Sequence, residues 1–220
     1  MKRLGFIGVL VLLLASVSPC AAQQVVDKMV ATVNAGVKTD LITYSDLMWQ
    51  LALQPGTSLD NPTSADLNRA LRLVIDQRLI LQEADKLPTL VPSPAEIAES
   101  RNALARAFES RQQFEDRLRR VGLTSERLDE IIDQRLKIEK YLDFRFRNFV
   151  VIGQKEIADY YSTVYVPRFK ARAPGAIVPS LDQAKAEIEK NLVEAKIESD
   201  TDAFLDTARE RAEIVMLSPV

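Results

Sequence analysis

The sequence predicts a mainly α-helical fold of about seven helices, with a short β-strand near each end of the chain that can pair with the other. Three observations lead to this prediction. Apolar residues recur at helical spacing over most of the chain, and most of these segments start at a capping residue. Strict alternation of side chains is confined to two short stretches, residues 29–34 and 212–217.

The elements near the N-terminus are one strand and two helices. The strand covers residues 29–34, where apolar and polar side chains alternate before a turn at Asn-Ala-Gly. A first helix follows Thr43, which has Asp46 three residues later, as in a capping box. A longer helix follows Thr63 in the same way and ends before Pro88.

The later helices start at boundaries of the same kind, and most of them have Glu or Gln at the third helical position. Their capping residues are Ser93, Ser110, Thr124, Gly153 and Ser180. Gly122 is a natural C-cap for the helix that follows Ser110. The alternating run AEIVML, residues 212–217, predicts the second strand, so we expect the two ends of the fold to meet.

The first residues predict export. Two basic residues precede the apolar run GFIGVLVLLLASVSP, which is too short to span a bilayer comfortably. Small residues follow, so residues 1–22 are predicted to be a signal peptide cleaved between Ala22 and Gln23. The alternative is a lipoprotein signal acylated on Cys20, which Pro19 disfavours. No later stretch of the sequence predicts a membrane span.

Composition excludes several kinds of site. The chain has no histidine, and its one cysteine lies within residues 1–22. The mature chain is therefore predicted to use no thiol nucleophile, no Ser-His-Asp triad, no histidine general base and no histidine-ligated zinc. Residues 1–22 include two basic residues and no acidic ones, so their removal leaves a net charge near −4. That charge gives no reason to expect a nucleic-acid partner.

Several motifs resemble those of a known family. The chain contains VVDKMVATVNAG, LITYSDL, QRLILQ, RLRRVGL and EIADYY in this order. Together they resemble the N-terminal domain of SurA-type periplasmic chaperones of Gram-negative bacteria, and residues 180–217 resemble the C-terminal segment of that family. One departure is GVKTDLITYS, which is longer than the family's usual turn between strand and helix.

The resemblance implies a domain organisation. A helical chaperone domain would cover residues 23–161, and residues 180–220 would pack back on it as a helix and a strand. In the family, a parvulin-type peptidyl-prolyl isomerase domain of about a hundred residues, often with active-site histidines, lies between these parts. Here residues 162–179 form only a short linker, expected to be an exposed basic loop that contacts at most an acidic client or a lipid surface. The resemblance therefore implies a non-enzymatic chaperone without cofactors.

A chaperone of this kind needs an exposed apolar groove for unfolded segments, and aromatic and methionine side chains suit such a surface. Each candidate residue has the alternative of filling the core, where aromatic residues at helical spacing are more often found. The candidates are Met29, Met48, Trp49, Phe108, Phe114, Tyr160 and Tyr161.

Two further clusters have competing interpretations. The run FRFRNF, residues 144–149, is typical either of a base-stacking strip or of a helix end with buried aromatics and solvated arginines, and we expect the second. Asp129, Glu130 and Asp133 are a possible carboxylate pair for hydrolysis, but their spacing from basic residues favours a salt-bridged helix face.

The leading hypothesis is an exported, ATP-independent chaperone of the periplasm that binds unfolded outer-membrane proteins through an apolar groove and has no isomerase activity. The alternative is a structural or assembly adaptor that docks on one dedicated partner, such as a separate isomerase, or forms a homo-oligomer. A third hypothesis, an isomerase with an unfamiliar site, predicts acceleration of the slow uncatalysed X-Pro isomerisation.

Overall fold

The structure is a computed structural model that describes residues 27–36 and 38–220. The predicted signal peptide and its cleavage site between Ala22 and Gln23 lie outside the described residues. None of the helices in the described part of the chain is both long enough and apolar enough to cross a bilayer.

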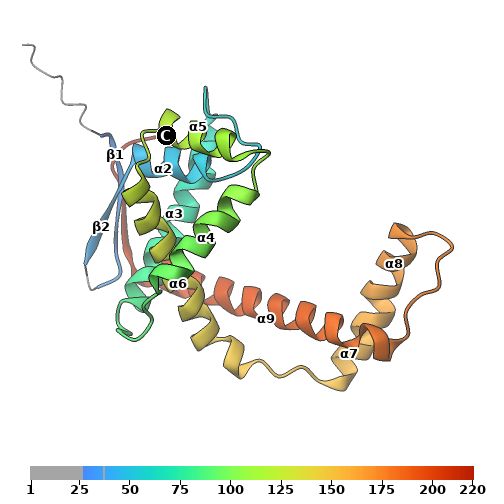
Figure 1. The fold of residues 1–220 in the computed structure, drawn as a ribbon. Coiled ribbons are helices and arrows are strands. Elements are labelled where there is room, and N and C mark those ends of the chain that lie inside the picture. The colour runs from blue at the N-terminus through green and yellow to red at the C-terminus, as the bar shows by residue number, and fades with distance from the viewer. Residues whose placement is uncertain (1–26, 37) are drawn as a thin grey trace, which may run out of the picture.

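The chain forms a body and a projecting arm (Figure 1). The body contains a small sheet and the first five helices, and the arm is built on the longest helix, which leaves the body and carries two short helices at its far end (Figure 1). The helices are α2 (Tyr44–Ala52), α3 (Ser64–Ala84), α4 (Pro94–Arg106), α5 (Arg111–Arg120), α6 (Ser125–Arg145), α7 (Gln154–Tyr160), α8 (Val166–Arg172) and α9 (Leu181–Arg211). The prediction of a mainly helical fold is confirmed.

The sheet joins the two ends of the described chain. Its strands are β1 (Met29–Asn34), β2 (Thr39–Thr43) and β3 (Glu213–Met216), in the antiparallel order β2-β1-β3. The predicted pairing of the terminal strands is confirmed, because β3 pairs directly with β1. The sequence did not predict β2, which fills the long segment between the first strand and α2.

The predicted helix starts are also confirmed. Thr43, Thr63, Ser93 and Ser180 each accept a hydrogen bond from the backbone N–H at the third helical position, where a side chain in turn caps the capping residue. Gly153 has no side chain, but its N–H donates to Glu156 at 2.7 Å. The same chemistry that predicted the boundaries therefore holds them in the folded chain.

The main core lies between the inner face of the sheet and helices α2, α3 and the end of α9. Gln82 is fully buried at its centre. Its amide nitrogen donates to the carbonyl of Val33 (3.2 Å) and to Asp40 (2.7 Å), and its amide oxygen accepts from the N–H of Ala35 (3.0 Å). One side chain of α3 thus ties both strands of the first hairpin to the helix, because a buried amide needs these partners.

The second core joins α4, α5 and α6 below the end of α2. Its centre is formed by Phe108 and Phe114, whose rings lie 5.2 Å apart, and by Leu128 and Ile132 on α6. Arg101 on α4 pairs with Asp129 on α6 at 2.7 Å, and Lys140 on α6 pairs with Glu96 on α4 at 2.5 Å. The body therefore has two adjoining apolar clusters with ion pairs on the outside.

The arm differs from its prediction. Residues 162–179 were expected to form a loop, but the helix of α7 continues through a π-helical turn, η2 (Tyr161–Tyr165), into α8 and ends at Arg172. Pro167 lacks an N–H and crowds the preceding turn, and the wider π-helical turn lies directly before it. The hydroxyls of Ser162 and Thr163 donate to the carbonyl of Asp159, where the helical ladder changes. Only residues 173–180 remain non-helical.

The arm has a small core of its own. Ile157 on α7 packs against Ala184 and Ile188 on α9, and partly buried aromatic residues surround them. Where α9 reaches the body, Arg209 pairs with Asp76 on α3 at 2.8 Å. Helix α9 is thus held at one end by the body and at the other by α7 and η2.

Candidate functional site

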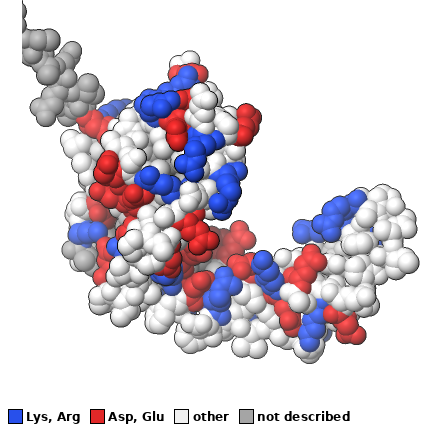
Figure 2. Space-filling view, viewed as in Figure 1, with Lys and Arg blue, Asp and Glu red and all other residues white. Residues whose placement is uncertain are grey.

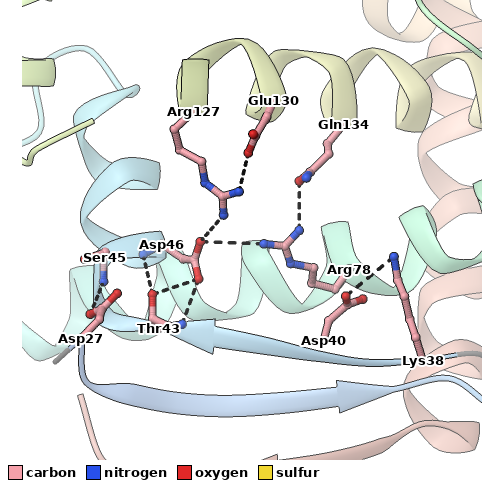
Figure 3. A network of polar contacts seen from close by, with 10 residues as sticks. All are labelled: Asp27, Lys38, Asp40, Thr43, Ser45, Asp46, Arg78, Arg127, Glu130 and Gln134. Carbon is pink, nitrogen blue, oxygen red and sulfur yellow. Dashed lines mark hydrogen bonds and ion pairs between the residues drawn. The ribbon is translucent and has the colours of Figure 1, made fainter. Parts of the chain in front are cut away.

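A network of polar side chains joins α2, α3 and α6 on one side of the body (Figure 3). Its centre is Asp46, in the first turn of α2, whose side chain is only 10% exposed. One carboxylate oxygen accepts from the N–H (2.9 Å) and the hydroxyl (3.1 Å) of Thr43. The other oxygen lies 3.5 Å from Arg127 and 3.8 Å from Arg78. Asp46 therefore caps its own helix and pairs with two neighbouring ones.

The outer members of the network extend these contacts. Arg78 donates to Gln134 at 2.9 Å, Arg127 pairs with Glu130 at 2.7 Å, and the N–H of Ser45 donates to Asp27 at 3.2 Å (Figure 3). Asp27, Asp46 and Arg78 come from three of the motifs that resemble the SurA family. Asp46 pairs with Arg78, and Asp27 joins them through the N–H of Ser45, so the motifs contribute to a structural joint of the body.

The predicted groove residues Met48 and Trp49 lie beside this joint. Met48 is half-buried against the main core. The indole N–H of Trp49 donates to the carbonyl of Val121 at 3.1 Å, and the guanidinium of Arg127 lies 5.0 Å from its ring. The crevice that Trp49 lines between α2, α3 and α6 has a volume of about 30 Å³. That space holds about one water molecule and no client side chain.

Phe108 and Phe114 are core residues, 7% and 4% exposed. Their rings contact each other in a tilted arrangement in the second core, and the guanidinium of Arg117 lies 5.7 Å from the ring of Phe108. The expectation that they line an exposed groove is therefore corrected. The alternative interpretation, that these aromatic residues fill the core, is confirmed, because both side chains belong to the second core.

Met29 belongs to an exposed apolar area on the sheet. We call this area the sheet patch; it consists of large apolar side chains that are 41–54% exposed on or just after the three strands. Its members are Met29, Leu41, Val215 and Leu217; Met216 is also 54% exposed, but it pairs with the buried Ala31 and so lies on the other face of the sheet. Large apolar side chains that stay exposed together on one face of a sheet are a candidate interaction surface.

Strand register explains how the sheet patch forms. Thr32 of β1 is paired with Leu41 of β2 on one side and Val215 of β3 on the other, so these three side chains form a row across the outer face. Met29 is paired with Thr43, two residues after Leu41, and reaches the same face because the register shifts between Met29 and Ala31. Sequence alternation indicated the strand but could not indicate which face stays open.

Tyr160 and Tyr161 lie far from the sheet patch, on the arm. Tyr161 donates from its hydroxyl to the carbonyl of Pro179 at 2.8 Å and stacks on Tyr165, whose ring centre is 5.8 Å away. Phe169 stacks on Tyr165 in turn, at 6.2 Å. Tyr160 packs on the arm core and lines a groove of about 280 Å³ with residues of α8 and α9. The predicted residues thus separate into the sheet, the body core and the arm.

The FRFRNF run connects the body to the arm, and its arrangement matches the expectation in part: Arg145 and Arg147 are exposed and Phe146 is half-buried, but the other two phenylalanines are not buried. Phe144 and Phe149 are 55% and 78% exposed, so they are not buried aromatics. Arg145 lies between the rings of Phe146 and Phe204, 5.6 and 5.2 Å from their centres. Arg147 pairs with Asp143 (2.7 Å) on α6 and Glu194 (3.0 Å) on α9, which keep its pKa above the ordinary value. The arginines hold the connection, Phe146 packs against Phe204, and Phe144 and Phe149 face outward.

The carboxylates of α6 form salt bridges, as their spacing from basic residues predicted. Asp129 pairs with Arg101 at 2.7 Å, Glu130 pairs with Arg127 at 2.7 Å, and Asp133 pairs with Lys137 at 3.0 Å. Each carboxylate has its own cation. Within residues 27–36 and 38–220, no cluster of potential metal ligands was found.

Arg117 is a structural residue that the sequence did not single out. Its guanidinium donates to four backbone carbonyls, those of Leu51, Ala52, Gln54 and Thr57, at 2.8–3.1 Å. It therefore caps the C-terminal end of α2, and burial lowers its pKa from the ordinary value. No local pattern could have indicated this role, because α5 and the end of α2 are far apart in sequence.

A scan against protein-family models finds no matching family, and a search of curated proteins finds no match.

Proposed function

We propose that this protein is an ATP-independent chaperone of the SurA type, exported to the periplasm, which holds unfolded outer-membrane polypeptides and has no isomerase activity. The observation that carries the proposal is the sheet patch, where four large apolar side chains stay exposed on or just after the three strands that join the ends of the fold. A surface of this kind suits weak, sequence-tolerant binding of apolar segments, because methionine and aliphatic side chains adapt to varied partners.

The shape of the molecule supports the proposal. A hollow lies between the far end of the arm and the body (Figure 2), and it offers a second position where an unfolded chain can bind. The exposed phenylalanines of the connection, Phe144 and Phe149, add apolar surface between the two parts. Contacts at several points on one long client raise its overall affinity even when each contact is weak.

The test is binding of a labelled unfolded outer-membrane polypeptide, followed by fluorescence anisotropy at micromolar protein. The double variant Leu41→Thr/Val215→Thr keeps good strand formers but removes apolar surface from the centre of the sheet patch. We expect it to bind roughly tenfold more weakly, given the usual free energy per unit of apolar area buried. The matched control is Leu73→Gln/Val91→Thr, which alters two exposed apolar residues away from the sheet.

The result also separates the chaperone from a dedicated adaptor. An adaptor or homo-oligomer that uses the same sheet patch would have a fixed molar mass by light scattering and would ignore unfolded polypeptides. If the protein fails to bind the unfolded polypeptide at micromolar concentration, or if both double variants bind like the original chain, the chaperone proposal is wrong.

A further inference from the structure

The far end of the arm carries a local positive charge. Residues 160–181 contain three basic residues, Arg168, Lys170 and Arg172, and no acidic residue. All three are exposed, and none of them forms an ion pair with the part of the chain that the structure describes. The whole chain has a net charge of −2, so this positive charge is local.

The basic side chains border a preformed groove. Arg168 and Arg172 lie one helical turn apart on α8 and line the groove of about 280 Å³ together with Tyr165 and Phe169, whose rings stack at 6.2 Å. The opposite wall comes from α9, with Glu187 and Asn191. The groove thus combines flat aromatic surface, two guanidinium groups and one amide. This is the chemistry that receives an apolar side chain and a neighbouring carboxylate.

The position of the groove favours a polypeptide over a membrane. Figure 2 shows basic side chains at the arm tip on the side that faces the hollow between the arm and the body. A flat bilayer cannot enter such a hollow, whereas an extended chain can lie along it. The guanidinium groups can pair with carboxylates there, and the aromatic rings offer surface to apolar neighbours.

From this charge complementarity we infer that the arm-tip groove is a second contact site, which selects client segments that combine acidic and apolar residues. The inference rests on the proposed chaperone function, because it assumes that the occupant is an unfolded polypeptide. It adds a preference that the apolar sheet patch cannot supply. Glu187 also lines the groove and repels an acidic occupant. The preference for acidic segments therefore depends on how far the attraction by Arg168 and Arg172 exceeds the repulsion by Glu187.

The test compares two labelled peptides that are identical except that the glutamates of one are glutamines in the other. Binding to the purified protein is measured by anisotropy at low and at physiological ionic strength. We expect the acidic peptide to bind better. Arg168→Gln/Arg172→Gln should reduce that preference by roughly three- to tenfold, since exposed ion pairs contribute modestly. Glu187→Gln should increase it, and salt should weaken it.

The control is Arg72→Gln/Arg106→Gln, which makes the same change in net charge on exposed positions of the body. It should leave the preference unchanged. Equal binding of the two peptides to the original protein, or an equal effect of both arginine pairs, overturns the inference while leaving the chaperone proposal intact. Failure of both peptides and of the unfolded outer-membrane polypeptide to bind overturns both. Arginine-dependent binding to phosphatidylglycerol vesicles without a peptide preference would assign the groove to lipid instead.

Discussion

At the scale of single residues, Arg117 joins α5 to the C-terminal end of α2. Four carbonyl groups at the end of α2 and in the following loop accept its guanidinium protons, and the side chain also covers the ring of Phe108. Carbonyl groups at a helix end have no partner within the helix, so they depend on a donor from elsewhere. Arg117 supplies that donor from α5 and thereby fixes α2 against the second core.

We expect Arg117→Ala to lower the free energy of unfolding by about 2–3 kcal/mol, because hydrogen bonds to a charged donor are lost and carbonyls are left unpaired. Urea titration followed by circular dichroism measures the change. Arg119→Ala is the matched control, because Arg119 is exposed and pairs only with Asp116 within its own helix. Its effect should stay within about 0.5 kcal/mol. Equal effects of the two variants would contradict the capping role.

Glu96 makes stability depend on pH. Its carboxylate pairs with Lys140 at 2.5 Å and accepts from the N–H of Ser93 at 2.7 Å. These contacts lower its pKa from 4.5 to about 2. A depressed folded pKa means that the carboxylate adds stability that is fully present above pH 4.5 and is lost as the pH falls toward about 2.

The variant Glu96→Gln tests this dependence, because glutamine can still cap Ser93 but cannot pair with Lys140 as an anion. Its free energy of unfolding should be lower than that of the original chain at pH 7, and the difference should shrink between pH 4.5 and 2. Urea titrations across that range provide the measurement. Glu99→Gln, an exposed change on the same helix, should show no such trend. A difference that is constant with pH would refute the assignment.

At the scale of elements, the arm is the part least supported by the rest of the fold. Only Ile157, Ala184 and Ile188 are fully buried in its cluster, whereas the main core of the body joins the sheet to three helices. Segments with few buried contacts open locally at a lower free energy than the whole chain. We therefore expect α7, η2 and α8 to detach from α9 without unfolding of the body.

Two isoleucines with the same 1% exposure test this expectation. Ile157→Ala removes a core side chain of the arm, and Ile132→Ala removes one from the second core of the body. Each loss costs roughly 2–5 kcal/mol locally. Hydrogen exchange should show that Ile157→Ala exposes residues 154–172 while the main thermal transition stays in place. Ile132→Ala should lower that transition, and an equal drop for both variants would show that arm and body unfold together.

The arm contains the helical segment that the sequence did not predict. Pro167 and the basic residues after it indicated a loop, because proline usually ends a helix. The π-helical turn before Pro167 could not be predicted from spacing, since it reflects a local change of the ladder that hydroxyls of Ser162 and Thr163 support. Helix starts, in contrast, were predictable because a capping residue and its partner are three positions apart.

At the scale of the whole molecule, two terminal strands could be predicted to meet, and they do. The strand β2 was not predicted, although it pairs with β1, its neighbour in the chain. The hydrogen bonds of Gln82 could not be predicted, because their partners are distant in sequence. For the same reason, sequence alone could not separate core aromatics such as Phe108 from exposed residues such as Met29. Of the sheet patch, the sequence analysis named only Met29, because the exposure of Leu41 and Val215 depends on the register of the sheet.

The most direct test of the central claim is suppression of aggregation. A urea-unfolded outer-membrane β-barrel protein is diluted into the purified protein, and light scattering is followed over time. The chaperone proposal predicts suppression near equimolar amounts, reduced by Leu41→Thr/Val215→Thr and unaffected by Leu73→Gln/Val91→Thr. Unchanged aggregation in the presence of the protein, with circular dichroism showing that it is folded, would contradict the proposal and favour an adaptor for one dedicated partner.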